Sequence, residues 1–550
     1  MDIGAPKKEF ELKLRVAPEN IATLKNHPIL SNTLHDPTRE TLNSIYYDSD
    51  NWRLHDRGLT LRVRRIGDKC IQTLKALDQG SGCFERLEWE QAIEGDQPDL
   101  TRVPNTALGA ILTNEVSNAL KPIFETRIDR TAYHLNGGDT AIAIAIDEGQ
   151  IIANDSSCPV CEIELELEHG NPAELFKVAR SINDVVPAEL DVKSKSERGY
   201  ELIEKTPITA VKAHGVELTA GMATSRAFTL IGRACLCHLI DNVPPAINRN
   251  SEGLHQMRVA LRRLRAAISL FSEVVSDDRV NTIKTELRWL AREFGPARDL
   301  DTLLIEVLKP LRKQYANESG LVSISKMFAR ERLKSYKRAQ EAVQSARFRA
   351  LVLDTAEWIE VGPWNTSNDP VIRARHELPI ETHAALQLSQ RRKKIKRRGA
   401  KIRDMTPEQL HRLRIQIKKT RYAAEFFSSA YPGKKTANRC KKILSSLTQL
   451  QDYLGGYNDI ITRKALFADI RNSPGRGLTA EQNRQRAFAA GLIIGDQQAQ
   501  LPKLLDGAES AYSRFEGVKI FWKLPRERDA VVQPQQILTI NNVAGGDQIA

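Results

Sequence analysis

The spacing of hydrophobic and polar residues changes once along the chain, near residue 205. Before this point, short segments such as Leu59–Arg65 and Cys161–Leu167 alternate apolar and polar residues, which is typical of β-strands with one buried face. From about residue 222, apolar residues recur every three or four positions, which predicts amphipathic helices. We therefore expect an α+β multidomain protein, with an antiparallel barrel or strongly curved sheet followed by an all-α part.

These patterns divide the chain into four predicted segments. A strand-rich domain covers residues 1–205, a linker covers 206–221, and a helical domain covers 222–525. Residues 526–550 have no helical period and are rich in Gln, Asn and Gly. We predict a disordered tail there.

An internal repeat runs through the helical part. The segment His255–Phe271 aligns without gaps with His411–Phe427, an offset of 156 residues, and Gly295–Asp299 matches Gly455–Asp459 at an offset of 160. Self-similarity over several helices indicates a tandem duplication. The two copies are expected at about 222–370 and 371–525.

Charge is divided in the same way. Residues 1–205 carry 24 Lys and Arg against 35 Asp and Glu, a net charge of −11. The remaining residues carry 57 against 34, a net charge of +23. The basic domain predicts an anionic partner such as nucleic acid, acidic lipid or polyphosphate.

Other features of the sequence bear on location. No basic start is followed by an apolar run, and nowhere do 18 apolar residues stand together, so neither a secretory signal nor a membrane-spanning helix is expected. Seven widely spaced cysteines indicate reduced thiols rather than a disulfide framework or a zinc site. We expect a cytoplasmic protein without a membrane partner.

Charged residues are grouped by sign on the predicted strands. Because side chains at i and i+2 share a strand face, four charged sets are predicted, whereas Arg65 faces away from its neighbours. The sets are Glu9, Glu11 and Lys13; Arg62 and Arg64; Arg86, Glu88 and Glu90; and Glu162, Glu164 and Glu166. A closed barrel would enclose such faces in a polar tunnel. Carboxylates there bind hard divalent cations, and Arg and Lys bind phosphoryl oxygens, as phosphoryl transfer requires.

Seven segments of residues 1–205 carry a family resemblance. They are Glu9-x-Glu11-x-Lys13, Ser44–Asp48, Arg57–Arg64, Thr73–Lys75, Ile146–Gly149, Cys161–Glu166 and Ser194–Tyr200. In this order they resemble the CYTH domains, the triphosphate tunnel metalloenzymes. The resemblance implies an eight-stranded antiparallel β-barrel tunnel that hydrolyses a triphosphate with Mg²⁺ or Mn²⁺.

The resemblance also implies roles for individual residues. Catalytic roles fall on Glu9, Glu11 and Lys13. The metal side comprises Glu9, Glu11, Asp147, Glu162 and Glu164, with Glu166 as an alternative ligand on the last acidic strand. The phosphates are expected to contact Lys13, Arg62, Arg64, Lys75, Lys195 and either Arg127 or Arg130. Which two of the three glutamates bind metal stays open at this point.

Each copy of the duplicated helix carries a basic stripe beside its apolar stripe, roughly 100° round the helix. The stripes are His255, Arg258, Arg262 and Arg265 in the first copy, and His411, Arg414, Lys418 and Arg421 in the second. Few acidic residues accompany them at i+4, which favours an anion-binding surface over a solvated face. Each histidine is either a helix-start residue bonded to the backbone or an anion contact.

The helical part resembles the CHAD domain at Glu252–Arg265, Gly295–Asp299, His411–Tyr422 and Gly455–Asp459. The resemblance implies a bundle of two related halves whose basic surface binds inorganic polyphosphate. We therefore expect a metal-dependent inorganic triphosphatase with a polyphosphate-binding domain. Adenylate cyclase or thiamine triphosphatase activity and a non-catalytic, granule-associated polyphosphate-binding protein are the alternatives. Few aromatic residues interleave the basic runs, which disfavours nucleic acid.

Overall fold

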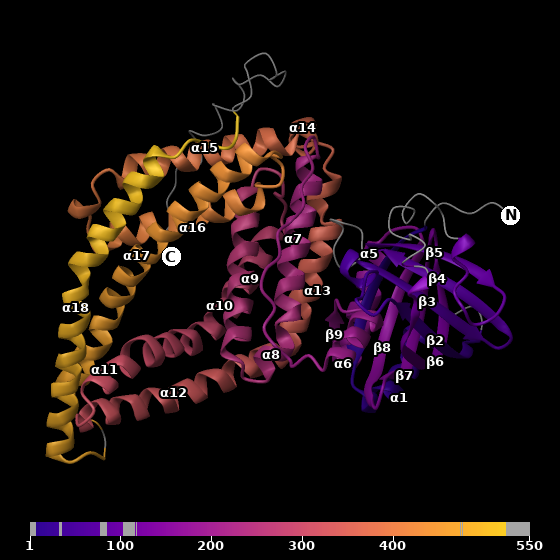
Figure 1. The fold of residues 1–550 in the computed structure, drawn as a ribbon, viewed down its shortest axis with the longest axis horizontal. Coiled ribbons are helices and arrows are strands. Elements are labelled where there is room, and N and C mark those ends of the chain that lie inside the picture. Colours follow the sequence, from indigo (N-terminus) through magenta and orange to yellow (C-terminus); the bar gives the residue numbers. More distant parts are fainter. Residues whose placement is uncertain are drawn as a thin grey trace.

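The computed structural model describes residues 7–31, 36–76, 85–102, 116, 118–473, 475 and 477–523, with only the backbone of residues 7–9, 85, 86 and 102. The predicted disordered tail at 526–550 lies outside the described residues. A strand-rich domain is followed by a helical one, as the hydrophobic pattern predicts (Figure 1).

The first domain is built on one antiparallel sheet. Its strands are β1 (Lys7–Val16), β2 (Thr38–Asp48), β3 (Leu59–Ile66), β4 (Lys69–Ala76), β5 (Glu85–Ile93), β6 (Lys121–Gly137), β7 (Thr140–Ala153), β8 (Ser156–His169) and β9 (Ala188–Asp191). They lie in the order β5-β4-β3-β2-β6-β7-β8-β1-β9, and β5 also pairs with β1. Short segments include η1 (Pro18–Asn20), α1 (Ile21–Lys25), α2 (Pro28–Ser31), η2 (His55–Arg57) and η3 (Leu100–Arg102).

The predicted closed barrel of eight strands is wrong in two respects. The described sheet has nine strands, because β9 adds to the second half of β1, from Lys13 to Val16. The sheet is also not closed along its length. Strand β1 meets β5 only over the four pairs from Lys7↔Glu88 to Phe10↔Glu85, and its later residues pair with β8 and β9 instead.

The two faces of the sheet differ in polarity, since side chains alternate along each strand. On β1, Leu12 and Leu14 are fully buried on the outer face, where helix α5 (Ala173–Val185) covers them with residues such as Phe176. The inner face carries charged residues. Helix α6 (Lys195–Glu204) packs beside β6, β7 and β8 and completes the domain.

The second domain consists of helices around two packed cores. They are α7 (Thr224–Asp241), α8 (Val243–Ile247), α9 (Ser251–Leu270), α10 (Val280–Thr302), the π-helical η4 (Leu303–Leu308), α11 (Lys309–Gln314), α12 (Ser319–Gln344), α13 (Ala346–Val361), η5 (Pro363–Thr366), α14 (Pro370–Glu377), α15 (Ile380–Gly399), η6 (Ile402–Asp404), α16 (Pro407–Phe426), α17 (Lys434–Asn472) and α18 (Ala480–Gly517). The repeat seen in the sequence corresponds to α9–α10 and α16–α17.

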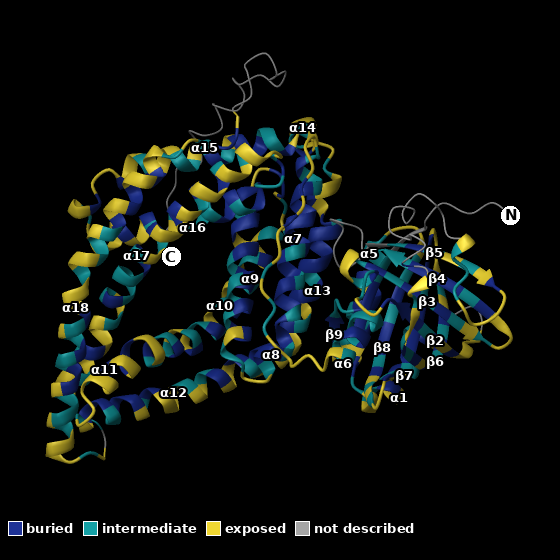
Figure 2. Ribbon diagram, in the orientation of Figure 1, coloured by how far each residue is buried: buried dark blue, intermediate teal, exposed yellow. Residues whose placement is uncertain are grey.

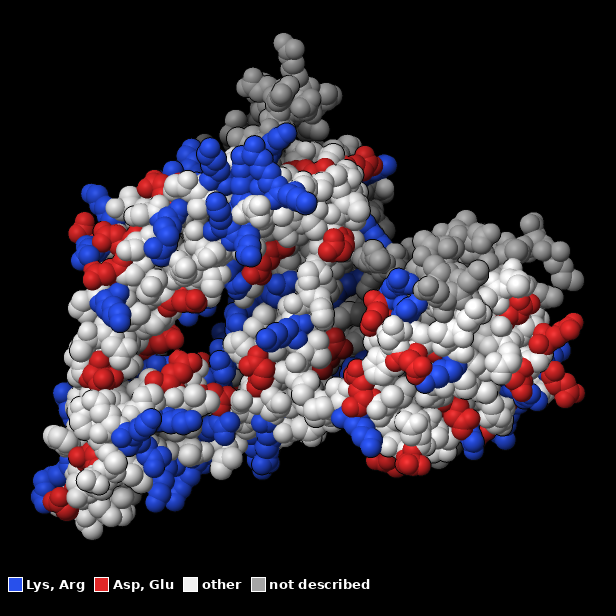
Figure 3. All heavy atoms as spheres, in the orientation of Figure 1, with Lys and Arg blue, Asp and Glu red and all other residues white. Residues whose placement is uncertain are grey.

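The long helices enclose a passage through this domain. A small core at the far end joins α12 and α18 through residues such as Leu321, Phe328 and Ile493, while α7, α9 and α13 pack densely near the sheet (Figure 2). The space-filling view shows the passage open, with Lys and Arg side chains at its margin (Figure 3). One helical hairpin contains α10 and α12, and the other contains α17 and α18. The two hairpins meet at their tips and therefore form a ring.

The two domains contact each other through α5 and α13. Arg180 donates to Asp354 at 2.9 Å and also pairs with Glu357, and Arg349 donates to Asn183 at 2.9 Å. None of the described helices combines the length and hydropathy needed to cross a membrane.

The cysteines match the expected reduced state only in part. Five of them are free thiols, namely Cys70, Cys158, Cys161, Cys235 and Cys440. Cys237 is disulfide-bonded, so the expectation of reduced thiols is wrong for this residue.

Candidate functional site

The inner face of the sheet lines a polar cavity of about 280 Å³. Strand parity directs the charged side chains of β1, β3, β4, β5, β6 and β8 into it, and α6 contributes a lysine at one end. Its charged lining residues are Glu11, Lys13, Arg62, Arg64, Lys75, Glu88, Glu90, Arg130, Glu164, Glu166 and Lys195. The predicted tunnel residues on these elements thus converge on one space.

One wall of the cavity is basic. Arg62 and Arg64 stand two residues apart on β3, and Lys75 lies beside them on β4. Lys75 Nζ lies 2.7 Å from Glu88 and Arg62 Nη2 lies 3.4 Å from the same carboxylate. Burial lowers the pKa of Arg64 to about 10, and the positive charges of Arg62 and Arg130 add to the effect. Glu88 and Glu90 lie beside these three basic residues, so the wall keeps one net positive charge, which favours an anionic ligand.

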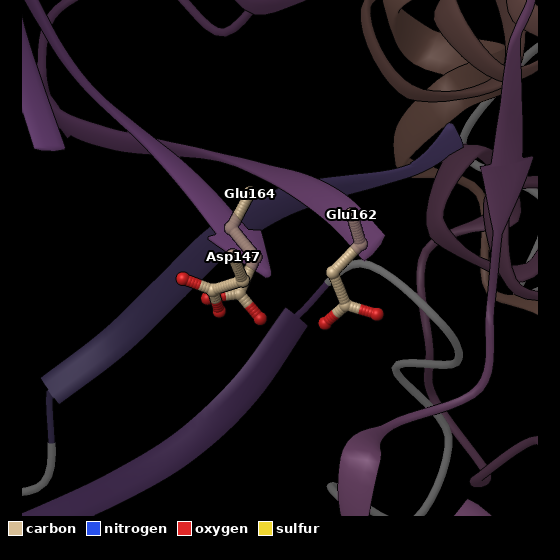
Figure 4. A group of neighbouring side chains, drawn as sticks. All are labelled: Asp147, Glu162 and Glu164. Carbon is tan, nitrogen blue, oxygen red and sulfur yellow. The ribbon is translucent and has the colours of Figure 1, made fainter. Parts of the chain in front are cut away.

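A carboxylate cluster lies across the cavity on β7 and β8. One carboxylate oxygen from each of Asp147, Glu162 and Glu164 lies within 4.8 Å of the others (Figure 4). Asp147 and Glu162 are register partners, and both are fully buried. Glu164 reaches the cavity.

Two basic side chains hold the cluster. Lys195 Nζ lies 2.7 Å from Asp147 and 2.9 Å from Glu164, and it also pairs with Glu162. Arg130 donates two hydrogen bonds of 2.7 Å to Asp147. Burial alone would raise the pKa of Asp147 and Glu164, but the charges of Lys195 and Arg130 outweigh it and lower both pKa values. The carboxylates of Asp147 and Glu164 are therefore ionised at neutral pH.

Helix α6 places Lys195 by three local contacts. Ser194 caps the helix in a reciprocal capping box with Glu197. A Cβ atom at Gly199 would lie 2.4 Å from the ring of Phe124, so only glycine lets the helix approach β6 this closely. Tyr200 donates a 2.8 Å hydrogen bond to buried Asp48. Lys195, at the first position of the helix, is thereby held over the cluster.

The donor set of the cluster fits a divalent metal ion. Hard cations such as Mg²⁺ and Mn²⁺ prefer carboxylate oxygens, and three such oxygens converge here. The ammonium of Lys195 lies among them, which shows that the site accommodates positive charge. Asp147, Glu162 and Glu164 are the residues that could hold the ion.

The structure separates the residues that the sequence left ambiguous. Arg130 lines the cavity, whereas Arg127 is 61% exposed and pairs with Glu125 at 2.7 Å. Glu166 lines the cavity but is not a member of the cluster. Arg65 faces away, as strand parity predicts, and pairs with Asp96.

Glu11 and Lys13 lie together in the cavity. Lys13 Nζ is 3.7 Å from Glu11 and 3.4 Å from Glu164. The backbone of Glu9 pairs with that of Arg86, and the Glu9 side chain lies outside the described part of the chain.

Three charged residues near the site received no role in the sequence analysis. Arg198 pairs with Glu162 from the turn of α6 after Lys195, and its i+3 spacing from Lys195 was the available signal. Glu88 and Glu90 line the basic wall. The alternation of these residues on β5 is visible in the sequence. Only the register Lys75↔Glu88 shows which basic side chains they face.

In the helical domain, corresponding residues of the two repeats make corresponding contacts. Arg258 Nη2 lies 3.5 Å from Asp299, and Arg414 Nη2 lies 4.0 Å from Asp459. These are the same two positions of the aligned segments. The duplication is therefore expressed in side-chain geometry as well as in sequence.

The two basic stripes meet where α9 contacts α16. Arg262 Nε lies 3.4 Å from the hydroxyl of Tyr422. Burial lowers the pKa of Lys418 to about 7, with further lowering from the positive charges of Arg414 and Arg262. The effect of Arg262 on Lys418 places residues of both copies on one shared surface.

The remaining stripe residues differ in their surroundings. Arg421 forms an ion pair with Glu425, so part of its charge is already neutralised. Burial and the positive charge of Arg288 lower the pKa of Arg265. Burial and Arg298 lower the pKa of His255 to about 4, so its imidazole is neutral at pH 7. His411 is exposed, with Nδ1 2.6 Å from Asn458 Oδ1.

Comparison with known proteins assigns both domains. A CYTH domain matches residues 7–200 and a CHAD domain matches residues 230–468. The chain belongs to the proteins that carry a CYTH domain followed by a CHAD domain.

Three individual relatives share 18% to 31% sequence identity with this chain over the aligned parts. An inorganic triphosphatase of Haemophilus influenzae is 31% identical over 210 residues, which cover 37% of this chain and 57% of that protein. The CHAD domain of the plant Ricinus communis is 26% identical, covering 56% of this chain and 96% of that one, with a TM-score of 0.46. A Hippeastrum protein described as a putative adenylyl cyclase with a dominant triphosphatase activity is 18% identical, covering 35% and 95%, with a TM-score of 0.28.

Proposed function

We propose that the CYTH domain hydrolyses inorganic triphosphate with Mg²⁺ or Mn²⁺, and that the CHAD domain binds inorganic polyphosphate. The observation that carries the first part is that a group of basic side chains and a carboxylate cluster meet at one cavity, which the cluster reaches through Glu164. A chain of phosphates needs positive charge along its length, and its hydrolysis needs neutralisation of charge at the reacting phosphorus.

The basic wall would bind the substrate. Arg62 and Arg64 offer paired N–H donors to phosphoryl oxygens, and Lys75 adds a third charge beside them. Arg62 and Lys75 contact Glu88 in this structure, so substrate binding replaces that carboxylate with phosphate oxygens. The same side chains then stabilise the negative charge that accumulates on the leaving phosphate.

The carboxylate side would hold the metal ion through Asp147, Glu162 and Glu164, with Glu11 nearby. A divalent ion bound there supplies further neutralisation of phosphoryl charge. Lys195 and Arg130 lower the pKa values of Asp147 and Glu164 and so favour their ionised forms. Lys195 also lines the cavity, so its ammonium can turn to the substrate once a metal ion occupies the cluster.

The lining of the cavity favours an inorganic substrate over a nucleotide or thiamine triphosphate. Among its described lining residues, the aromatic side chain is Tyr46, which is buried and stacked on Phe124 with ring centroids 4.4 Å apart. A base or thiazolium ring therefore finds no free aromatic face among these residues. The name of the Haemophilus influenzae relative, an inorganic triphosphatase, supports the same substrate.

Phosphate release by the purified full chain tests this function. Triphosphate, long-chain polyphosphate, ATP and thiamine triphosphate are compared in Mg²⁺, in Mn²⁺ and in a chelator. We expect the highest kcat/KM for triphosphate and no turnover in the chelator. Preference for ATP or thiamine triphosphate would replace the proposed substrate, and no release from any of them would favour a non-catalytic binding protein.

Polyphosphate binding by the helical domain is supported by the shared surface of the two stripes. A long chain of phosphates can contact Arg258 and Arg262 in one copy and Arg414 and Lys418 in the other at the same time. Binding of labelled polyphosphate to the full chain, in competition with duplex DNA at equal charge, tests it. We also propose the cytoplasm as the compartment, because five cysteines are free thiols and only Cys237 among the described cysteines is disulfide-bonded.

A further inference from the structure

A second cavity, larger than the catalytic one, lies between the two domains. Its volume is about 450 Å³, within the range of small-molecule sites. Strand β9, α6 and the segment that follows it line one side, and α7, α8 and α13 line the other. Arg198 lines this cavity and pairs with Glu162, so the cavity lies behind the carboxylate cluster of the CYTH domain.

Most of the charged groups in this lining already have partners. The pairs are Arg15 with Glu189 at 2.5 Å, Lys193 with Glu201 at 2.5 Å, Arg198 with Glu162, the Lys193 backbone N–H with Asp191 at 3.0 Å, and Arg349 with Asn183 at 2.9 Å. Asp241 is the exception: it has no hydrogen bond or ion pair among the described residues. Asp191 and Arg349 are bonded only to neutral groups, so together with Asp241 they leave one net negative charge in this lining.

The position of Asp241 makes this carboxyl group unusual. It is the last residue of α7, where the partial negative charge of the helix end disfavours an anion. Burial raises the pKa of Asp241 to about 7; Lys193 opposes the shift, while Glu197, Asp191 and Glu201 add to it. A cation placed beside Asp241 would relieve both the burial and the repulsion.

Much of the remaining lining is hydrocarbon, apart from residues such as Cys158, Thr206 and Thr209. Ile240, Val243 and Pro244 surround Asp241 on its own side, and Phe348 and Val352 face them from α13. Such a wall stabilises a ligand with an aliphatic body. We propose that this cavity binds an alkylammonium ligand, a protonated amine on a hydrocarbon chain such as a linear diamine, with Asp241 as the carboxylate that recognises the amine.

The chemistry predicts how binding depends on pH. An amine of this class stays protonated between pH 6 and pH 8, whereas Asp241 ionises in that range. The ammonium binds the ionised form, so affinity rises with pH by roughly tenfold between pH 6 and pH 8, and the complex forms with loss of a proton.

Calorimetric titration of the full chain with 1,6-diaminohexane, without phosphate compounds, tests the proposal. We expect binding of one equivalent, no binding of hexane-1,6-diol, and proton release at pH 6.5. Asp241→Asn keeps the shape but removes the charge, and it should weaken binding at pH 8 at least tenfold and abolish the pH dependence. Asp155→Asn, at an exposed position of the strand-rich domain, makes the same charge change and should bind as the wild type does.

A second variant separates the carboxylate from the cavity. Ile208 lines the cavity and is 59% exposed, so Ile208→Trp narrows the space without disturbing the core, and it should also weaken binding. Unchanged affinity in both Asp241→Asn and Ile208→Trp would place the diamine elsewhere and overturn the proposal. Equal binding of the diol would show an apolar cavity without amine recognition, which overturns it too.

Discussion

At the scale of single residues, the two faces of β3 allow a direct comparison of charge and position. Arg62 and Arg64 line the catalytic cavity, while the adjacent Arg65 is exposed and pairs with Asp96. A charge-assisted hydrogen bond contributes about 1.5–3 kcal/mol. Arg62→Ala and Arg64→Ala should therefore each lower kcat/KM for triphosphate roughly tenfold to a hundredfold, and Arg65→Ala should leave it nearly unchanged. Steady-state phosphate release measures all three.

Neighbouring acidic residues on β7 provide a second comparison. Asp147 is fully buried in the carboxylate cluster, whereas Glu148 points to the other face and pairs with Lys25. Asp147→Asn removes one negative charge from the proposed metal site, so hydrolysis should fall below detection at low Mg²⁺. Glu148→Gln is the matched control and should keep its activity. If Asp147→Asn hydrolysed triphosphate normally in the same Mg²⁺ titration, the cluster would not be the metal site.

The lowered pKa of Lys418 predicts a pH effect on polyphosphate binding. Arg262, Arg414 and Arg421 oppose its protonation, and Asp459 favours it. With a pKa of about 7 instead of 10.5, Lys418 loses its charge as the pH rises from 6 to 8. Affinity for polyphosphate at constant ionic strength should fall over that range. Lys418→Arg stays charged, so the fall should be smaller in that variant, and an equal fall would assign the effect to other groups.

At the scale of elements, the start of α6 links local structure to the site. Ser194 caps the helix that carries Lys195, and loss of such a cap costs about 1 kcal/mol. Ser194→Ala should therefore lower the unfolding free energy by about this amount and also lower activity, because Lys195 loses its fixed position. Thr479→Ala removes an equivalent capping box from α18, far from the cavity. Thr479→Ala should lower the unfolding free energy by a similar amount and leave hydrolysis unchanged. Thermal unfolding measures the first effect and phosphate release measures the second.

Strand parity explains which parts of the site were predictable from sequence. Alternation along β1 and β3 places Glu11, Lys13, Arg62 and Arg64 on one face, and they line one cavity. Arg127 and Arg130 are three residues apart, so their side chains lie on opposite faces of the strand. Parity alone does not tell which of the two faces inward. The register that pairs Arg130 with Asp147 decides this, and register depends on long-range pairing.

Elements without a strong pattern were not predictable. Strand β9 has four residues, too few to show alternation, so the ninth strand and the changed pairing of β1 were missed. The cavity between the domains depends on how α6, α7 and α13 pack, which no local pattern encodes. By contrast, the long 3.6-residue periods of α9 and α16 predicted those helices correctly.

At the scale of the whole molecule, the ring of helices and the shared basic surface predict a dependence on ligand length. Triphosphate spans only one stripe, whereas a long chain contacts both, and the second contact is then intramolecular and strengthens binding without new groups. Affinity of the full chain should rise steeply with polyphosphate length and then level off. It should also fall steeply with salt, as for other polyanions.

Single and double substitutions test whether the two copies act together. Arg258→Ala and Arg414→Ala alter equivalent positions, each close to the aspartate of its own repeat. Each should remove most of the advantage of a long chain while hardly changing the weak binding of short ones, and the double variant should bind long and short chains alike. Lys337→Ala, an exposed lysine on α12 with an i,i+4 partner, is the control for net charge. Losses that were the same at every chain length would mean that the stripes bind separately, even though Arg262 and Lys418 lie close enough for one to shift the pKa of the other.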